Sequence, residues 1–255
     1  MPQLADSHVH LDDARFDADR DAVLRRAHAA GVMLQVVPGV DAASWTRIEA
    51  LCTPGSGLFP AWGLHPMLMH VHRDEDLATL PQWLETKRPV AVGEIGLDFH
   101  HEDHDAERQR DYFRRQLMLA RDFDLPVILH ARAAMDEVTT TLRHMGGLRG
   151  VVHSFSGSEQ QAEQLWKIGF HLGIGGPVTY DRAQRLRKIV AKMPIEYLLL
   201  ESDAPDQSGA AHRGERNEPS YIPDVLHCIA ALRGEDPADI AAVTTANTRR
   251  LFGIT

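Results

Sequence analysis

The chain alternates short apolar runs with amphipathic segments eight times, and this alternation constrains its fold more than any other feature. The apolar runs have the length of strands, whereas the segments between them carry apolar residues at helical spacing. Near-continuous apolar strands that alternate with helices predict a parallel sheet covered by helices. The predicted strands cover residues 4–10, 32–37, 58–62, 90–98, 126–130, 151–153, 170–174 and 197–200.

Eight such units in one chain favour closure of the sheet into a TIM (β/α)8 barrel, an α/β fold. A length of 255 residues suits one catalytic domain of this kind, which would span residues 1–255. The alternative is an open doubly wound sheet, which requires a glycine-rich fingerprint after its first strand. The sequence has no such fingerprint there, so we predict the barrel.

Composition narrows the class of protein further. No apolar run reaches the length of about eighteen residues that a membrane span needs, and the amino terminus lacks the pattern of a signal peptide. We therefore expect a cytoplasmic protein. We also expect it to be a monomer. Cys52 and Cys228 are far apart and are expected to be buried thiols. The formal net charge of -9 argues against a broad basic surface that coats nucleic acid. It does not exclude a nuclease, because bound divalent cations supply their own positive field.

Histidines and carboxylates recur where the predicted strands end. In a barrel these ends form one face, and active sites are built on it. His8 and His10 flank Val9 on the first predicted strand, so their side chains are expected on the same side. Such a convergence of nitrogen and oxygen donors predicts a metal centre. The residues at the strand ends are His8, His10, His65, Glu94, His130, His153, Glu201 and Asp203.

The donor set indicates which ions the centre would take. Nitrogen and oxygen ligands without thiolate suit Zn, Mn, Fe(II) or, with several waters, Mg. Six ligands are too many for one ion with an open position, so we predict two divalent ions (Zn, Mg or Mn) that share Glu94. No lysine lies at the rim, so Glu94 takes the bridging place that a carbamylated lysine has in several amidohydrolase-like barrels. The predicted ligands are His8, His10 and Asp203 for one ion, and His130 and His153 for the other.

The strand ends and the loops that follow them carry short motifs along the whole chain. These motifs are DSHVHL from Asp6, GLHP from Gly63, VGEIGLD from Val92, PVILH from Pro126, HSFSG from His153, LESDAP from Leu200, RNEP from Arg216 and NT from Asn247. Together they resemble the TatD family of metal-dependent deoxyribonucleases. The resemblance implies a TIM barrel, a dinuclear metal centre with the six ligands named above, and hydrolysis of nucleic-acid phosphodiesters, typically at a 3′ end. Met67 and Ala131 depart from residues common in the family, and residues 173–180 and 204–206 resemble a branch described only as metal-dependent hydrolases.

The remaining polar residues of the rim have predicted roles in catalysis or substrate binding. Asp203 is expected to act as ligand and proton acceptor, and Glu201 to orient a water or a neighbouring ligand, unless Glu201 is only a hydrogen-bonded rim carboxylate. His65 and Arg132 are candidates to hold a substrate phosphate, although Arg132 is almost as consistent with a solvated salt bridge. Arg216, in a long polar loop, is a further substrate contact or an anchor of that loop.

Three conspicuous features have plainer interpretations. The group His100, His101 and His104, with Glu102 and Asp103, is expected to be a solvated loop. The arginines of the predicted helix that begins near residue 183 are expected to form a solvated face. The glycines of residues 173–176 resemble a phosphate loop weakly, and a tight turn explains them as well.

These observations lead to a functional hypothesis and two alternatives. The hypothesis is a metal-dependent hydrolase that cleaves phosphodiester bonds with an activated water, as a 3′–5′ exodeoxyribonuclease. An ester or amide hydrolase, such as a misacylated-tRNA deacylase, would use the same water. A non-catalytic metal-binding module would show no turnover, and the acidic residues beside the predicted ligands count against it.

Overall fold

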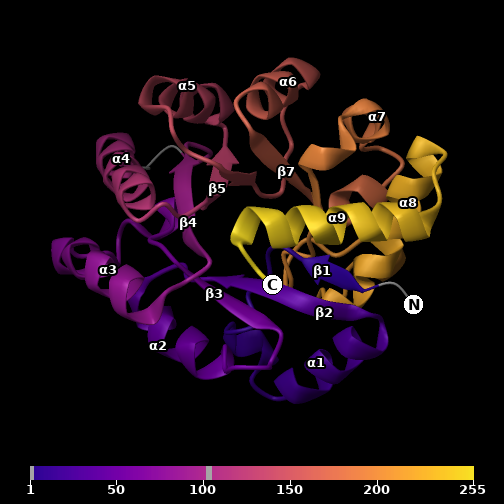
Figure 1. The fold of residues 1–255 in the computed structure, drawn as a ribbon, viewed down its shortest axis with the longest axis horizontal. Helices are drawn as coiled ribbons and strands as arrows, with labels where there is room; N and C mark the ends of the chain where they lie inside the picture. The colour runs from indigo at the N-terminus through magenta and orange to yellow at the C-terminus, as the bar shows by residue number, and fades with distance from the viewer. Residues whose placement is uncertain (1–2, 102–104) are drawn as a thin grey trace.

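The computed structural model describes residues 3–101 and 105–255 and contains a single parallel sheet (Figure 1). Its strands follow one another in chain order, each paired in parallel with the next. This is the order of a TIM barrel, so the predicted fold class is confirmed. The strands are β1 (Leu4–Asp6), β2 (Val32–Pro38), β3 (Leu58–Trp62), β4 (Ala91–Asp98), β5 (Val127–Arg132), β6 (Gly150–Val152), β7 (Phe170–Ile174) and β8 (Leu198–Leu200).

Backbone contacts bring the two ends of the sheet together, which excludes the open doubly wound alternative. The Ser7 N–H donates to the Leu200 carbonyl at 2.9 Å, across the remaining gap between β8 and β1. Beyond the strands, the Asp203 N–H donates to the His8 carbonyl at 2.9 Å and the His10 N–H to the Ala204 carbonyl at 2.8 Å. The segments that follow β1 and β8 therefore run side by side, and both carry predicted ligands.

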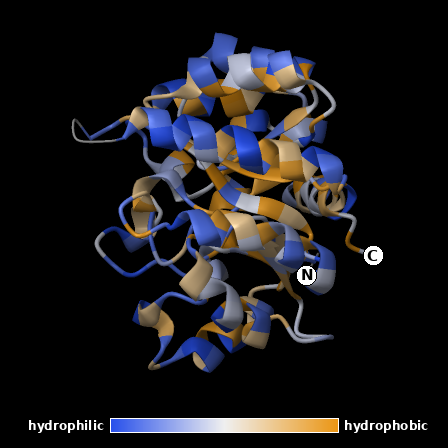
Figure 2. Cartoon of the chain, turned by 90° about the vertical axis from the view of Figure 1, so that its left-hand side faces the viewer, coloured by the Kyte–Doolittle hydropathy of each residue, from blue (hydrophilic) through white to orange (hydrophobic). Residues whose placement is uncertain are grey.

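Helices surround the sheet, and their polar faces point outwards (Figures 1 and 2). Helix α4 shows why they pack this way, because Tyr112, Phe113 and Leu117 lie on one face of an otherwise polar helix and are all buried. The helices are α1 (Arg20–Ala29), α2 (Ala42–Leu51), α3 (Asp74–Lys87), α4 (Ala106–Asp122), α5 (Met135–Met145), α6 (Glu159–Lys167), α7 (Gln184–Lys192), α8 (Ile222–Arg233) and α9 (Pro237–Phe252).

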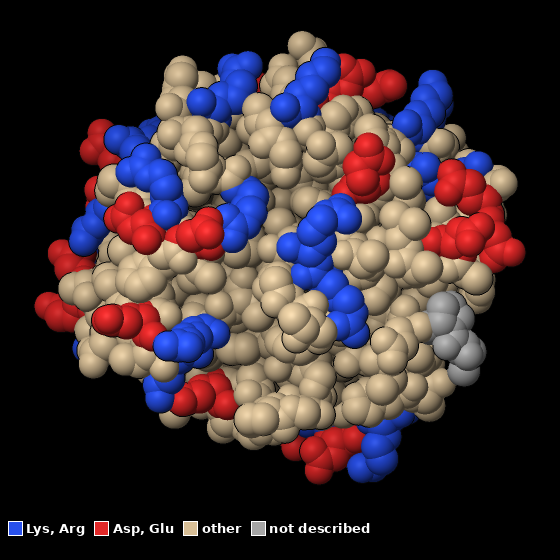
Figure 3. Space-filling view, in the orientation of Figure 1, with Lys and Arg blue, Asp and Glu red and all other residues tan. Residues whose placement is uncertain are grey.

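The end of α9 closes the amino-terminal end of the barrel. Its residues Leu251 and Phe252, with Ile254, pack against small and branched side chains of the strands. Figure 1 shows α9 crossing in front of the strands, and the face seen in Figure 3 carries acidic and basic side chains interspersed around its rim. Because this end is sealed, the carboxyl ends of the strands remain for a site. The strand residues of this cluster are Ala5, Leu34, Val36, Ala61, Ala91, Ile128, Val151 and Leu199.

Two predicted strands end later in the chain than the observed ones. Strand β1 ends at Asp6 and β6 at Val152, so His8, His10 and His153 lie just beyond strands rather than on them. Their backbone is nevertheless held like a strand by the neighbouring segments, as the His153 N–H donation to the Leu129 carbonyl at 3.0 Å shows. None of the described helices is long and apolar enough to cross a membrane.

Candidate metal centre

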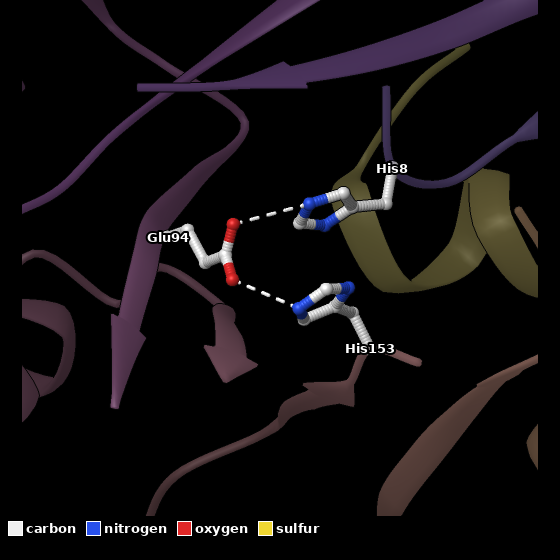
Figure 4. Close-up of side chains that lie close together, drawn as sticks. All are labelled: His8, Glu94 and His153. Atoms are coloured by element: carbon white, nitrogen blue, oxygen red, sulfur yellow. Dashed lines mark ion pairs between the residues drawn. The ribbon is translucent and has the colours of Figure 1, made fainter. Parts of the chain in front are cut away.

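Glu94 lies at the centre of the candidate site, on β4, and its side chain is 1% exposed. The register of β4 against β5 shifts around it, because Val92 pairs with Val127 whereas Ile95 pairs with Leu129. Such a bulge redirects a side chain, and bulges are common beside active sites. The Glu94 carboxylate points into the mouth of the barrel, towards histidines from other strand ends (Figure 4).

The two oxygens of Glu94 face two different groups of histidines. Oε2 lies 3.2 Å from His8 Nε2 and 3.6 Å from His10 Nε2. Oε1 lies 2.8 Å from His153 Nε2, 2.9 Å from His65 Nε2 and 3.3 Å from His130 Nδ1. One carboxylate thus stands between two clusters of nitrogen donors. Figure 4 shows one contact of each kind, to His8 and to His153.

Asp203 completes the cluster on the Oε2 side. Its Oδ1 lies 3.5 Å from His8 Nε2 and 3.6 Å from His10 Nε2, while these two nitrogens are 3.1 Å apart. The amide of Gln207 donates to the other Asp203 oxygen. His8, His10 and Asp203 therefore form one compact group, and His65, Glu94 and His130 form a second. His153 stacks on His8 with ring centroids 3.9 Å apart, and these two residues form a third group with Glu94.

These spacings are the ones that a shared cation requires. Ligand atoms about 2.1 Å from one ion, in tetrahedral or octahedral geometry, lie about 3.0–3.4 Å from one another. His8 Nε2 lies 3.1 Å from His10 Nε2 and 3.2 Å from Glu94 Oε2, and His130 Nδ1 lies 3.3 Å from Glu94 Oε1, so these pairs have such separations. Two ring nitrogens at this distance would repel each other if both carried protons, whereas both can donate lone pairs to one cation. The residues present therefore fit divalent metal.

Electrostatics within the site also favour a cation. Burial alone would raise the pKa of Glu94, but the neighbouring imidazoles, His153 foremost, hold it well below its usual range, so Glu94 is ionised. Burial and the neighbouring His153 lower the pKa of His8 to about 4, which leaves its ring neutral and its lone pair available. Although burial opposes it, the Glu94 charge raises the pKa of His153 to about 10. The buried carboxylate thus attracts positive charge in the absence of an ion.

Asp98 and Asp6 support the candidate ligands, although neither is among the site residues predicted from the sequence. Asp98 Oδ2 lies 2.7 Å from His130 Nε2, which fixes the ring so that Nδ1 faces Glu94. Glu94 and Asp98 are four positions apart on one strand, and this even spacing is a signal that could have identified Asp98. Asp6 accepts hydrogen bonds from the Ser202 hydroxyl at 2.6 Å and the His8 N–H at 3.2 Å. It therefore ties the segment after β1 to the segment after β8.

Glu201 lies behind His153 rather than beside Asp203. The strand ends before it, so the two carboxylates do not share a face as expected. Glu201 Oε1 accepts the Ser154 N–H at 2.5 Å and lies 3.8 Å from His153 Nδ1. Burial raises the pKa of Glu201 to about 8. A Cβ on Gly173 would lie 1.9 Å from Glu201 Oε2, so only glycine leaves room for this carboxylate.

The predicted substrate contacts are found in different places. His65 lies inside the site, against Glu94, and is itself placed to donate to an ion. Arg132 is exposed on the wall of a cavity of about 900 Å³ that opens above the cluster. Arg216 does not line this cavity, because its guanidinium pairs with Asp19 at 2.8 Å and Glu218 at 3.0 Å. The role of Arg216 as a substrate contact therefore stays a prediction, whereas its alternative role as a loop anchor fits this pairing.

Two histidines of the loop after β4 lie within the described residues. The rings of His100 and His101 lie 5.1 Å apart, and among the described residues neither belongs to a group of donors that could hold an ion. The His100 N–H donates to Asp98 Oδ1 at 3.0 Å, which links this loop to the support of His130. Glu102, Asp103 and His104 lie outside the described residues.

Comparisons with known proteins agree with this geometry. A family model described as TatD related DNase matches residues 5–253. The chain is 43% identical over 253 residues to a protein of Escherichia coli (strain K12) named an uncharacterized metal-dependent hydrolase, YjjV, with 98% of this chain and 97% of the relative covered. It is 35% identical over 257 residues to the 3′-5′ ssDNA/RNA exonuclease TatD of Erwinia tasmaniensis, with 98% and 99% covered.

A solved structure shows the same architecture. The crystal structure of YjjV, a TatD homologue from E. coli K12, matches with a TM-score of 0.95 and 40% identity, over 99% of this chain and 98% of that one. The family match and both relatives extend over almost the whole chain, including every strand end that carries a candidate ligand. The chain therefore belongs to the TatD family and is a metal-dependent hydrolase of that type.

Proposed function

We propose that this hydrolase removes nucleotides from the 3′ ends of single-stranded nucleic acid, with two divalent ions held on either side of Glu94. The observation that carries the proposal is the division of donors between the two Glu94 oxygens, with His8 and His10 on one side and His65, His130 and His153 on the other. A relative with 35% identity is named a 3′-5′ ssDNA/RNA exonuclease, which supports the substrate class.

Zn, Mg or Mn bound there would supply positive charge that attracts a phosphodiester. The same charge would lower the pKa of a water, so that the water can lose a proton and attack the phosphorus. The chain's own residues have complementary parts. Asp203, 8% exposed at the floor of the cavity, can ligate an ion with one oxygen and accept a proton from the attacking water. Glu201 acts as a positioning residue, because it lies behind His153 and keeps that ring directed at Glu94.

The open cavity suits a strand end. Exposed Arg47 and Arg132 lie on its walls, and no carboxylate of the described residues is within 4.0 Å of either guanidinium. Guanidinium groups bind phosphate oxygens in a fork geometry, so these two arginines can hold phosphates while the ester bond lies over Glu94. One chain supplies every residue of this site, so the proposal requires no partner subunit, and we expect a monomer in size-exclusion chromatography with light scattering.

The test begins with protein stripped by EDTA and reloaded with Zn, Mn or Mg. Wild-type protein should shorten 3′-labelled single-stranded DNA one nucleotide at a time and bind two ions per chain by elemental analysis. Glu94→Gln should bind at most one ion and lose at least about a hundredfold in activity, because changes even to supporting residues of metal sites cost 10–100-fold. His144→Ala, on exposed residue 144 of α5, is the matched control.

Two results would contradict the proposal. Full hydrolysis by Glu94→Gln would show that the carboxylate does not bridge ions. Deacylation of a misacylated tRNA, without cleavage of any single-stranded end under the three metals, would move the substrate to the ester class.

A further inference from the structure

A second, smaller pocket adjoins the metal cavity and has no part in the function proposed so far. It has a volume of about 380 Å³ and lies between the segment after β6, the turn after β7 and the beginning of α7. We refer to it as the α7 pocket. Its volume is near the low end of the roughly 300–1,000 Å³ typical of small-molecule sites, so it accommodates one nucleotide rather than a duplex.

The α7 pocket is continuous with the metal cavity. Ser154, Ser156 and Gln207 line both. The Ser154 hydroxyl donates to Gln207 Oε1 at 2.8 Å, and the Gln207 amide donates to Asp203. Ser154 and Gln207 thus lie at the boundary between the two pockets, so a ligand that extends from Asp203 past them enters the α7 pocket.

Positive charge lines the α7 pocket without a compensating carboxylate. Arg182 and Arg185 are exposed on its wall, and none of the described residues that line it is acidic. Within the described chain, neither guanidinium has a carboxylate within 4.0 Å. In a chain with a net charge of -9, such a pocket beside a cation site favours an anionic ligand.

Both arginines are already held in place. The Arg182 guanidinium lies 5.2 Å from the centre of the Tyr180 ring, and the Tyr180 hydroxyl donates to the Ser208 carbonyl at 3.1 Å. Arg185 donates to the Ser156 carbonyl at 2.8 Å and keeps further N–H groups for a ligand. Helix α7, whose first turn has no side-chain cap among the described residues, starts at the same wall and adds its partial positive charge.

We propose that the α7 pocket binds the nucleotide that adjoins the scissile phosphate, with Arg182 and Arg185 contacting its phosphate. This inference rests on the proposed nuclease function and adds to it a preference for single-stranded oligonucleotides over isolated phosphodiesters. Arg182 and Arg185 then have a binding role, in place of the solvated face that the sequence indicates.

The first experiment measures binding without catalysis. Fluorescence anisotropy of a labelled single-stranded DNA is followed in EDTA over a series of salt concentrations. Arg182→Gln and Arg185→Gln should each weaken binding about tenfold and lower the slope of log affinity against log salt by about 0.7, the value for one phosphate contact to a single strand. Arg182→Lys should retain most of the affinity. Arg143→Gln, which removes an exposed arginine of α5, controls for the change in net charge.

The second experiment compares substrates with the metal-loaded protein. The loss of kcat/KM in Arg182→Gln should be larger for a trinucleotide than for bis(p-nitrophenyl) phosphate, which has no second nucleotide to place. Affinities and salt slopes equal to those of Arg143→Gln would overturn the α7 pocket as a subsite. If wild-type protein binds the DNA but hydrolyses neither substrate, the proposed function fails, whereas the anisotropy comparison still decides whether the pocket binds a nucleotide.

Discussion

Replacement of Gly173 by alanine tests how closely the barrel fits around Glu201. The backbone of Gly173 is in a strand and permits alanine, so any effect comes from contact. The added Cβ would lie 1.9 Å from Glu201 Oε2 and 2.7 Å from Glu201 Cδ. Since Glu201 is only 1% exposed, its carboxylate has to leave the Ser154 N–H to avoid this overlap.

The cost follows from three contributions. Overpacking of a buried site costs about 1–3 kcal/mol. Loss of the hydrogen bond from the Ser154 N–H leaves buried polar groups unsatisfied and costs about 1–3 kcal/mol. Alanine restricts the unfolded chain and returns about 0.4–1 kcal/mol. We therefore expect the free energy of unfolding to fall by about 2–5 kcal/mol, and activity to fall about 10–100-fold as His153 loses its support.

Urea unfolding followed by circular dichroism, in EDTA, measures the first effect. The decisive control is a double-mutant cycle with Glu201→Ala, which removes the side chain that the new methyl would strike. In that background, Gly173→Ala should cost less than about 1 kcal/mol, because the overlap and the hydrogen bond are already gone. The reasoning would be refuted if Gly173→Ala lowered the free energy of unfolding equally in both backgrounds, or by less than about 1 kcal/mol in the wild-type background. Either result would show that the Glu201 side chain does not limit the space at residue 173.

Three further predictions address other parts of the molecule. Asp98→Asn should weaken metal binding about 10–100-fold in isothermal titration calorimetry, because it removes the negative partner that orients His130; an unchanged affinity would argue against that role. His171 is buried on β7, and burial lowers its pKa to about 4 from 6.5, so its neutral form stabilises the fold above pH 6.5 and this contribution is lost as the pH falls towards 4. From pH 7.5 to pH 5, the free energy of unfolding measured in urea should therefore fall about 2 kcal/mol less in His171→Gln than in wild type. An equal fall in both proteins would contradict the lowered pKa of His171. Arg216→Ala should lower stability by about 1–2 kcal/mol through loss of its pairing with Glu218, without raising KM for an oligonucleotide; a higher KM would favour the substrate role over the loop anchor.

The sequence anticipated the ligands better than it anticipated their support. Histidines and carboxylates are rare at consecutive strand ends, so His8, His130 and Asp203 stood out as soon as the strands were recognised. Asp98 lies on the same strand as Glu94 and shows its role only once His130 is seen 2.7 Å away. No sequence pattern predicts the contact of Gln207 with Asp203, because this contact depends on the conformation of the polar loop that contains Gln207.

The sequence by itself determined the barrel and the side of the barrel on which the chemistry collects. Periodicity reports which residues face the core, and chain order then places all strand ends on one rim. Only the tertiary structure decided how the donors divide between the two Glu94 oxygens, and that His65 lies among them, because this depends on a register shift in β4 that hydrogen bonding to β5 defines. It also showed that Arg216 pairs with Asp19 and Glu218, and that Arg182 and Arg185 line a pocket beside the metal cavity. Long side chains on loops and helix ends take their direction from neighbours distant in sequence, which periodicity does not record.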